Sequence, residues 1–265
     1  MLERSGGGAE SGGSSRLRSI DALRGLAAIA VVLYHVAQNT NAVPANATVL
    51  KEVLGLGFTG VWLFFVISGF IMVHASGRLF GLPEARRLFL ARRIARIVPV
   101  YWAVTSAYLA IALLAPAALN PEFLGWGRVV ASYLFIPVPR PDGLVQPLYG
   151  LGWTLNYEMF FYVLFALAIA RPRTQAVLAL SAALVGLVAL GRFAGPLPQP
   201  LGFWSDPIVL EFVYGMGLAL LHAHGARLVS VARAGLAAAA VAALAAAAVA
   251  APDWAAAGRF LAYGL

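Results

Sequence analysis

The sequence predicts an all-α fold, a polytopic transmembrane helical bundle with about eight membrane segments and one short or re-entrant helix. Of the 265 residues, 61% are apolar and only 11% are charged. Soluble domains usually carry about 25% charged residues, and the mean hydropathy of this chain is +0.82. The composition therefore indicates a membrane protein and excludes an ordinary soluble domain.

The apolar residues gather into runs close to the roughly 20 residues that a helix needs to cross a bilayer. The segment 124–138 is shorter, carries Arg128 and leads into a proline-rich stretch, so we expect a short, re-entrant or broken helix there. The alanine-rich segment 235–252 is expected to be lipid-embedded scaffold. The long runs lie at roughly 20–38, 53–74, 94–114, 150–170, 175–191, 207–222 and 234–251, and a further run begins near Trp254.

Residues 1–15 are rich in glycine and serine. Such a segment buries too little apolar surface to fold, which predicts a disordered cytoplasmic tail. The transmembrane domain is therefore expected to span residues 16–265.

The net charge of +8 comes almost wholly from arginine, since Lys51 is the single lysine. The positive-inside rule makes the arginine-rich side of the membrane, and with it the N-terminus, cytoplasmic. The loops 39–48 and 193–207 hold few basic residues and are expected to face outward. This pattern indicates topology and ligand binding rather than a nucleic-acid-binding surface. If 124–138 does not cross, one side holds Arg16, Arg18, Arg78, Arg86, Arg87, Arg92, Arg93, Arg96, Arg171, Arg173, Arg227 and Arg233.

The chain has no cysteine, which excludes disulfides, thiolate catalysis and cysteine-ligated metals. His74, His222 and His224 lie at expected cytoplasmic span ends and show no H-x-x-x-H spacing. We therefore expect no metal site.

The first expected site lies in "DALRGLAAIAVVLYHV", residues 21–36. Arg24 and His35 are eleven positions apart, and eleven steps of about 100° return to the same helix face. Asp21, one turn before Arg24, is expected to pair with it, and His35 lies about 16 Å further along the helix. Ionisable residues inside a membrane are candidates for function. The alternatives are a topology anchor for Arg24 and a helix-contact hydrogen bond for His35.

The second expected site is "GWTLNYEMFFY", residues 152–162, which places Glu158 inside a span. No arginine lies within helical reach on this segment, so the carboxyl group is expected to be unpaired and protonated. On the expected topology Glu158 meets His35 at a similar depth, and a carboxylate that orients a neutral histidine makes it a workable general base. The alternative is a helix–helix hydrogen bond made by Glu158.

The third expected site is "EARRLFLARRIARIVPVYW", residues 84–102, a basic cytoplasmic loop that leads into a helix. Arg93 and Arg96 are three residues apart and present two guanidiniums on one face, a geometry that suits phosphate. Ordinary topology determination is the alternative.

Small residues interrupt the apolar run 57–72, where Gly57, Gly60 and Gly69 accompany Ser68. Such residues allow the close approach of helices or of a thin ligand such as a pantetheine arm. Both interpretations fit the sequence equally well.

Four segments resemble, in order and spacing, the membrane-bound acyltransferase 3 family: "RSIDALRGLAAIAVVLYH", "GFTGVWLFFVISGFIM", "RRIARIVPVYW" and "WTLNYEMFFY". This family includes bacterial O-antigen and exopolysaccharide O-acetyltransferases, and the resemblance covers roughly residues 18–165. It implies transfer of an acyl group, usually acetyl from cytoplasmic acetyl-CoA, to a hydroxyl of a cell-surface or exported carbohydrate. It also implies a multi-pass protein of the cell inner membrane, with acyl-CoA, membrane lipid and a lipid-linked or exported polysaccharide as partners and no nucleic acid.

The resemblance extends to individual residues. The R-x10-H motif of the family falls on Arg24 and His35, and its R-x-x-R motif falls on Arg93 and Arg96. The resemblance implies that this arginine pair holds the phosphates of coenzyme A and that His35 takes part in acyl transfer. The expected catalytic residues are therefore His35, Glu158 and Arg24, and the expected cofactor-binding residues are Arg93 and Arg96.

The third family motif, W-S-L-x-x-E, has threonine here in place of the usual serine. It falls on Trp153, Thr154, Leu155 and Glu158. The residues expected to support the site are Asp21, Ser68, Trp153 and Thr154.

Family members typically continue for further spans, whereas this chain stops at Leu265, so we expect it to be C-terminally shortened. Two alternatives to the enzyme stay open. One is a proton-coupled transporter in which His35 and Glu158 relay protons, and the other is an inactive truncated family member. A transporter is expected to contain internal repeats with broken helices, and the sequence shows no such pair.

Overall fold

The computed structural model describes residues 14–39, 56–115 and 124–225, and within these ranges the chain is helical with no β-strand. This confirms the predicted all-α class. The longer helices are α1 (Ser14–Asn39), α3 (Thr59–Ala75), α4 (Ala85–Leu114), α6 (Trp153–Ala168), α7 (Arg173–Phe193) and α9 (Leu210–Ala223). The shorter ones are α5 (Trp126–Tyr133) and α8 (Leu201–Trp204), with 3-10 turns η1 (Leu56–Phe58), η4 (Gly150–Gly152) and η5 (Pro207–Val209).

The six long helices coincide with the first six apolar runs of the sequence. The run 234–251, the run from Trp254 and most of the expected tail 1–15 lie outside the described residues. Four helical segments are long and apolar enough to cross a membrane, and Thr59–Ala75 and Pro207–Ala223 are shorter apolar helices. The chain is therefore a multi-pass membrane bundle. The four longer segments are Ser19–Ala37, Ala85–Leu114, Gly150–Ala168 and Arg173–Phe193.

The basic stretch 84–102 differs from the expectation, because it is helix rather than loop for nearly its whole length. Helix α4 begins at Ala85, directly after Pro83 and Glu84. Alanine, leucine and arginine are strong helix formers, so the positive charge of this stretch does not delay the helix. Arg93 and Arg96 consequently lie well inside α4 and keep a fixed angular relation on it.

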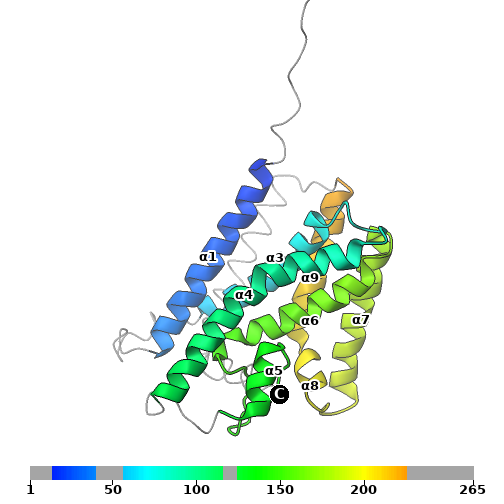
Figure 1. Ribbon diagram of the computed structural model, residues 1–265. Coiled ribbons are helices and arrows are strands. Elements are labelled where there is room, and N and C mark those ends of the chain that lie inside the picture. The colour runs from blue at the N-terminus through cyan, green and yellow to red at the C-terminus, as the bar shows by residue number, and fades with distance from the viewer. Residues whose placement is uncertain (1–13, 40–55, 116–123, 226–265) are drawn as a thin grey trace, which may run out of the picture.

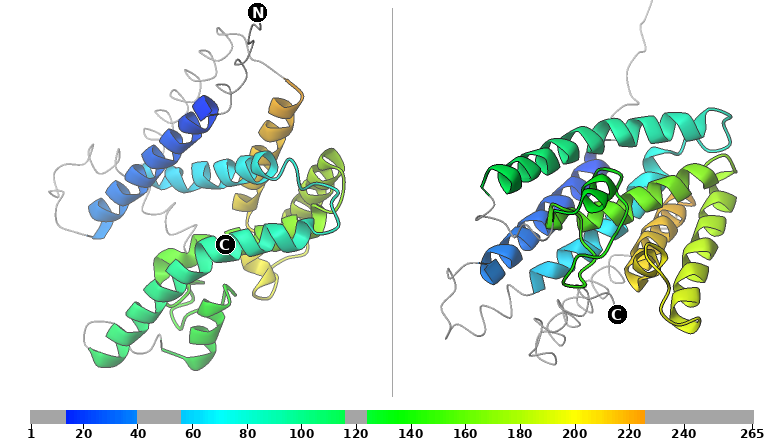
Figure 2. Two further views of the ribbon diagram at one scale, coloured as in Figure 1. Left: turned by 45° about the horizontal axis from the view of Figure 1, so that its top comes forward. Right: turned by 60° about the horizontal axis from the view of Figure 1, so that its bottom comes forward.

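The helices place the arginine-rich segments at one end of the bundle. Figure 1 shows the first turns of α1, α4 and α7 and the last turn of α9 at this end, which we call the basic end, and α5 and α8 at the opposite end. The further views in Figure 2 show α1 beside α3 and α4 alongside α6.

Helix α5 is short and does not cross the bundle, as the segment 124–138 predicts. It packs on the second half of α4, where the Trp102 indole N–H donates to the Tyr133 carbonyl at 2.9 Å and the Tyr101 hydroxyl donates to the Ser132 carbonyl at 3.1 Å. Helices α4 and α6 therefore run antiparallel, with their connection at the end opposite the basic end.

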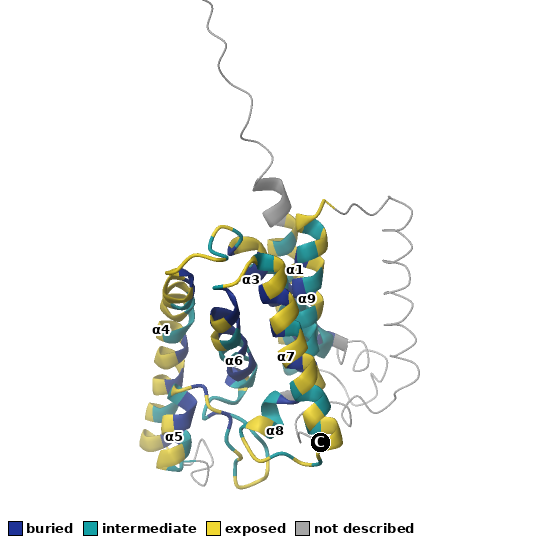
Figure 3. Ribbon diagram, turned by 90° about the vertical axis from the view of Figure 1, so that its right-hand side faces the viewer, coloured by how far each residue is buried: buried dark blue, intermediate teal, exposed yellow. Residues whose placement is uncertain are grey.

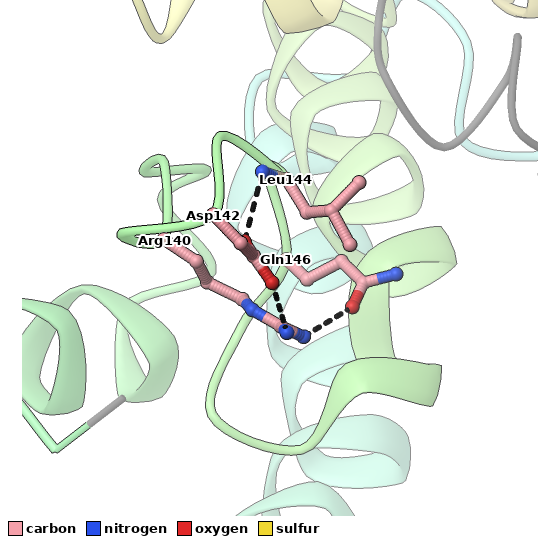
Figure 4. A network of polar contacts seen from close by, with 4 residues as sticks. All are labelled: Arg140, Asp142, Leu144 and Gln146. Atoms are coloured by element: carbon pink, nitrogen blue, oxygen red, sulfur yellow. Dashed lines mark hydrogen bonds and ion pairs between the residues drawn. The ribbon is translucent and has the colours of Figure 1, made fainter. Parts of the chain in front are cut away.

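A polar turn shapes the connection from α5 to α6 (Figure 4). The Arg140 guanidinium donates to the Gln146 side-chain oxygen at 2.9 Å and forms an ion pair with Asp142. The other Asp142 oxygen accepts the Leu144 N–H at 3.1 Å, and Gly143 adopts a φ of +85° that favours glycine. These contacts fix the conformation of the turn that precedes α6.

Helix α6 lies at the centre of the bundle, with α4 on one side and α7 on the other (Figure 3). Its buried Phe161 stacks on Phe212 of α9 at 4.2 Å between ring centroids, and Phe165 contacts Phe89 of α4 at 4.8 Å. In lipid the hydrophobic effect does not drive helices together, so the close packing of such rings supplies much of the attraction.

Glycines bring α3 into backbone contact with its neighbours. A Cβ at Gly57 or Gly60 would collide with backbone carbonyls of α1, and one at Gly69 would collide with the Phe212 carbonyl of α9. Gly215 faces the Val66 carbonyl in the same way from the α9 side. Of the two interpretations of these glycines, helix packing is the one that the structure bears out.

Candidate active site

A pocket of about 140 Å³ lies among α1, α3, α4 and α6. It combines three guanidiniums with one carboxylate, which is an unusual concentration of charge in a chain that is only 11% charged. We call it the arginine pocket, and its polar lining consists of Arg24, Ser68, Arg93, Arg96, Glu158 and Tyr162.

Helical periodicity explains why these side chains meet. Arg93 and Arg96 are three residues apart on α4, and Glu158 and Tyr162 are four apart on α6, so each pair shares a helix face. The antiparallel packing of α4 on α6 turns these two faces toward each other. The predicted common face of Arg93 and Arg96 is therefore confirmed, and this face lines a pocket.

The pocket offers hydrogen-bond donors to an anion. The Nε atom of Arg93 is buried and has no hydrogen-bond partner among the described residues, and the guanidinium lies 5.5 Å from the centroid of the Phe89 ring. Leaving a buried charged donor unsatisfied costs free energy, and an oxyanion that accepts from it removes that cost.

Glu158 has neighbours that its own segment does not reveal. The Tyr162 hydroxyl donates to Glu158 Oε2 at 2.9 Å. Arg24, Arg93 and Arg96 act electrostatically on the same carboxyl group. Within the described residues Glu158 forms no ion pair, as its segment predicts, but the arginines of α1 and α4 surround it, which its own segment could not show.

The expected pair of Asp21 and Arg24 is not formed. Asp21 is exposed and makes no ion pair with Arg24 in the described part of the chain. Arg24 instead lines the arginine pocket with Glu158. The i,i+3 spacing permits the pair, but Asp21 stays exposed and Arg24 acts electrostatically on the buried Glu158 carboxyl group instead.

His35 lies about three turns further along α1 and is not among the residues that line the arginine pocket. Its Nδ1 is 2.8 Å from the Val31 carbonyl oxygen. Because a carbonyl can only accept, Nδ1 carries the hydrogen, and in the neutral ring Nε2 then carries the lone pair. The lining of the pocket brings Glu158 to Arg24 rather than to His35.

Aromatic rings connect His35 to the third motif. The His35 ring meets Tyr34 edge-on at 5.2 Å, Tyr34 contacts Phe58 at 5.4 Å, and Phe58 stacks on Trp153 at 6.2 Å with an interplanar angle of 7°. We call these four residues the aromatic row. Trp153, a member of this row, and the following Thr154 begin α6, and neither lines the arginine pocket.

The comparison with known families identifies the class of protein. The family described as "Acyltransferase domain", the acyltransferase 3 family, matches residues 17–264. The chain belongs to the membrane-bound acyltransferase 3 family. No solved structure matches it.

Several curated relatives are acyltransferases or proteins of polysaccharide production. The exopolysaccharide production protein ExoZ of Rhizobium meliloti is 40% identical over 163 residues, which are 61% of this chain and 50% of that protein. The acyltransferase MdmB of Streptomyces mycarofaciens is 26% identical over 230 residues, 78% of this chain and 57% of that protein. The peptidoglycan O-acetyltransferase OatA of Listeria monocytogenes is 29% identical over 160 residues, 55% of this chain and 23% of that protein. The chain thus spans about half the length of the first two relatives.

Sequence reasoning on this acyltransferase-family chain missed two features. One is Tyr162, whose position four residues after Glu158 was a usable signal for a contact on one helix face. The other is a cavity of about 850 Å³ near the opposite end of the bundle. We call it the outer cavity, and its polar and aromatic lining consists of Trp62, Arg192, Ser205, Asp206 and Glu211. Trp62 is far in sequence from the other four, and the set forms no motif.

No group of three or more histidine or acidic side chains within the described ranges is arranged to hold a metal ion. His74 and His222 are neighbours across α3 and α9, with ring centroids 5.7 Å apart, and Phe70 packs against both. Their surroundings are aromatic packing.

Proposed function

We propose that this protein is an integral membrane O-acyltransferase, which moves an acyl group, acetyl in the simplest case, from acyl-CoA to a carbohydrate hydroxyl. The arginine pocket carries the proposal, because it joins residues of three family motifs in one place. Family membership and the relatives named for exopolysaccharide production and peptidoglycan O-acetylation support it.

The basic end faces the cytoplasm in this proposal, since arginine-rich loops stay on the cytoplasmic side of a membrane. The N-terminus is then cytoplasmic, and the protein belongs to the cell inner membrane. Acyl-CoA enters from the basic end, and the carbohydrate, lipid-linked or already exported, is met near the opposite end.

The donor binds through Arg93 and Arg96. The arginine pocket, at about 140 Å³, is smaller than the roughly 300–1,000 Å³ of sites that enclose a whole small-molecule ligand. It suits a phosphate group or a thin acyl-carrying arm of acyl-CoA, while most of the acyl-CoA molecule lies outside the pocket. The guanidinium groups of Arg93 and Arg96, which line the pocket, offer such a group hydrogen-bond donors. Arg24, which lines the same pocket, supports the donor path.

His35 performs the transfer step. The acceptor hydroxyl oxygen attacks the thioester carbonyl carbon, its proton passes to Nε2 of His35, the carbon–sulfur bond breaks, and coenzyme A leaves as a thiolate that takes up a proton. Alternatively, Nε2 first attacks the carbonyl and carries the acyl group before the acceptor takes it. The hydrogen bond from Nδ1 to Val31 supports both routes, because it directs the lone pair to Nε2.

Mass spectrometry of the surface polysaccharide tests this function. Deletion of the gene is expected to remove O-acyl groups from the polysaccharide. The parental protein is expected to restore them, and the His35→Ala variant is not. Unchanged acylation after deletion would refute the proposal, and restoration of full acylation by His35→Ala would remove His35 from the chemistry.

A further inference from the structure

The outer cavity is large enough for a ligand of several rings. Its volume of about 850 Å³ falls within the roughly 300–1,000 Å³ of small-molecule sites. Its lining residues come from the end of α7, from α8 and from the start of α9, and Trp62 comes from α3. Figure 1 shows α8 at the end opposite the basic end.

Close backbone approach holds the wall of this cavity in place. A Cβ at Gly191 of α7 would collide with the Ser205 side chain, and the Ser205 hydroxyl donates to the Gly202 carbonyl at 2.9 Å. Asp206 caps the following turn, since its Oδ1 accepts the Ile208 N–H at 2.8 Å. These contacts fix the positions of Ser205 and Asp206 in the wall.

The charge of the outer cavity favours a hydroxyl-rich ligand over an anion. It holds two carboxylates, Asp206 and Glu211, against one guanidinium, Arg192. Carboxylates accept hydrogen bonds and a guanidinium donates them, and each sugar hydroxyl can do both. Trp62 adds a flat apolar ring with one polar N–H, which suits the apolar face of a sugar.

These groups are available to a ligand within the described part of the chain. Arg192 and Glu211 form no ion pair with each other there, and Ile208 occupies only one oxygen of Asp206. Burial raises the pKa of the Asp206 carboxyl above its ordinary value, as expected for a poorly hydrated wall.

Trp62 connects the outer cavity to the helix that carries part of the aromatic row. Trp62 is four residues after Phe58, about 6 Å along the helix, and Phe58 belongs to the aromatic row that ends at His35. We propose that the outer cavity is the acceptor site, and that it binds a neutral sugar unit through Asp206, Glu211 and Trp62. This inference rests on the proposed function and names the acceptor side of it.

Binding measurements on the full chain in lipid nanodiscs test the acceptor site. The probe is a set of oligosaccharides cut from the surface polysaccharide of cells that lack the protein. The double variant Asp206→Asn with Glu211→Gln is expected to bind them at least tenfold more weakly than the parental protein, with unchanged acetyl-CoA affinity. Glu84→Gln is the matched control, since this carboxylate is exposed at the basic end, and it is expected to bind both ligands as the parental protein does.

The possible results distinguish a failure of the acceptor-site proposal from a failure of the proposed acyltransferase function. Equal oligosaccharide affinity in the double variant, or no oligosaccharide binding by the parental protein, overturns the acceptor site. If the parental protein binds oligosaccharide and the double variant does not, the acceptor site is supported. If the parental protein also transfers no acetyl group, the acyltransferase function is refuted while the site stands. If the double variant misfolds and also loses acetyl-CoA binding, the single variant Glu211→Gln provides the test. It is expected to bind oligosaccharide about threefold more weakly than the parental protein, and an unchanged oligosaccharide affinity would contradict the proposal.

Discussion

The arginine pocket and the outer cavity differ in size, charge and origin. The first encloses about 140 Å³ with three guanidiniums and one carboxylate, and the second encloses about 850 Å³ with one guanidinium and two carboxylates. Helix α3 contributes to both, through Ser68 in the pocket and Trp62 in the cavity. The bundle thus has one pocket with an excess of positive side chains and one cavity with an excess of acidic side chains. The proposed function assigns the first to the charged donor and the second to the neutral acceptor.

Replacing His35 tests whether the arginine pocket and the outer cavity serve one reaction, and this change has the largest expected effect on activity. His35→Ala should lower acyl transfer by about 10² to 10⁴, because a general base contributes that much. Acetyl-CoA affinity and oligosaccharide affinity should both stay at the parental values. Turnover by the purified protein with labelled acetyl-CoA measures this, with His74→Ala at the basic end as control, and transfer at the parental rate would contradict the assignment.

Removing two guanidiniums tests the donor side of the comparison. Arg93→Ala with Arg96→Ala should weaken acetyl-CoA binding by about ten- to a hundredfold for each guanidinium, since hydrogen bonds to charged groups are worth about 1.5–3 kcal/mol. Oligosaccharide binding should not change. The matched control is Arg86→Ala with Arg87→Ala, two exposed arginines of the same helix. An equal loss in both double variants would assign all four arginines to topology.

Replacing Gly215 tests the packing of α3 on α9. Helix α3 contributes residues to both the arginine pocket and the outer cavity. Gly215→Ala should destabilise the protein by about 1–3 kcal/mol, the usual cost of overpacking, since its Cβ would collide with the Val66 carbonyl. Gly217→Ala on the same helix meets open space and should be neutral. Thermal unfolding in detergent compares them, and equal stability would show that α3 and α9 can separate without cost.

Tyr162 tests how the carboxylate of the arginine pocket is held. Tyr162→Phe removes the 2.9 Å hydrogen bond to Glu158, and a typical hydrogen bond of about 0.5–1.5 kcal/mol corresponds to a two- to twelvefold change in turnover. Tyr157→Phe is the control, because the Tyr157 hydroxyl forms no hydrogen bond with any described residue and its removal breaks none. Equal kinetics in the two variants would leave Tyr162 as packing only.

Asp206 gives the smallest expected effect, a change in pH dependence. Its pKa in the folded protein is raised by burial above the ordinary value of about 3.9, so the folded state holds the proton more tightly than the unfolded state. Stability should therefore be greatest below the ordinary pKa and fall as the pH rises through the raised one. Asp206→Asn should flatten this fall in melting temperature, and an unchanged profile would show that the carboxyl group is well hydrated.

The sequence predicted most of what lies within single helices. The apolar runs located α1, α3, α4, α6, α7 and α9, and the length of 124–138 predicted a short, re-entrant or broken helix, of which the short one is found. Helical spacing placed Arg93 and Arg96 on one face. The start of α4 was missed because arginine, although charged, is a good helix former.

The contacts between helices were predicted less well. Glu158 was expected beside His35, on the assumption that similar depth brings two residues together, and Asp21 was expected beside Arg24. Depth along a helix follows from residue count, but the rotation of one helix against another does not. Glycine contacts and stacked rings, such as Gly69 on the Phe212 carbonyl, decide that rotation.

The sequence by itself determined the class of the protein, its family, the basic end and the residues that share each helix face, because periodicity and composition are local properties. Only the tertiary structure decided that Arg24 and Glu158 line one pocket, that aromatic rings join His35 to Trp153, and that Trp62, Asp206 and Glu211 line one cavity. These groupings join segments far apart in the chain, and side-chain packing between helices selects them.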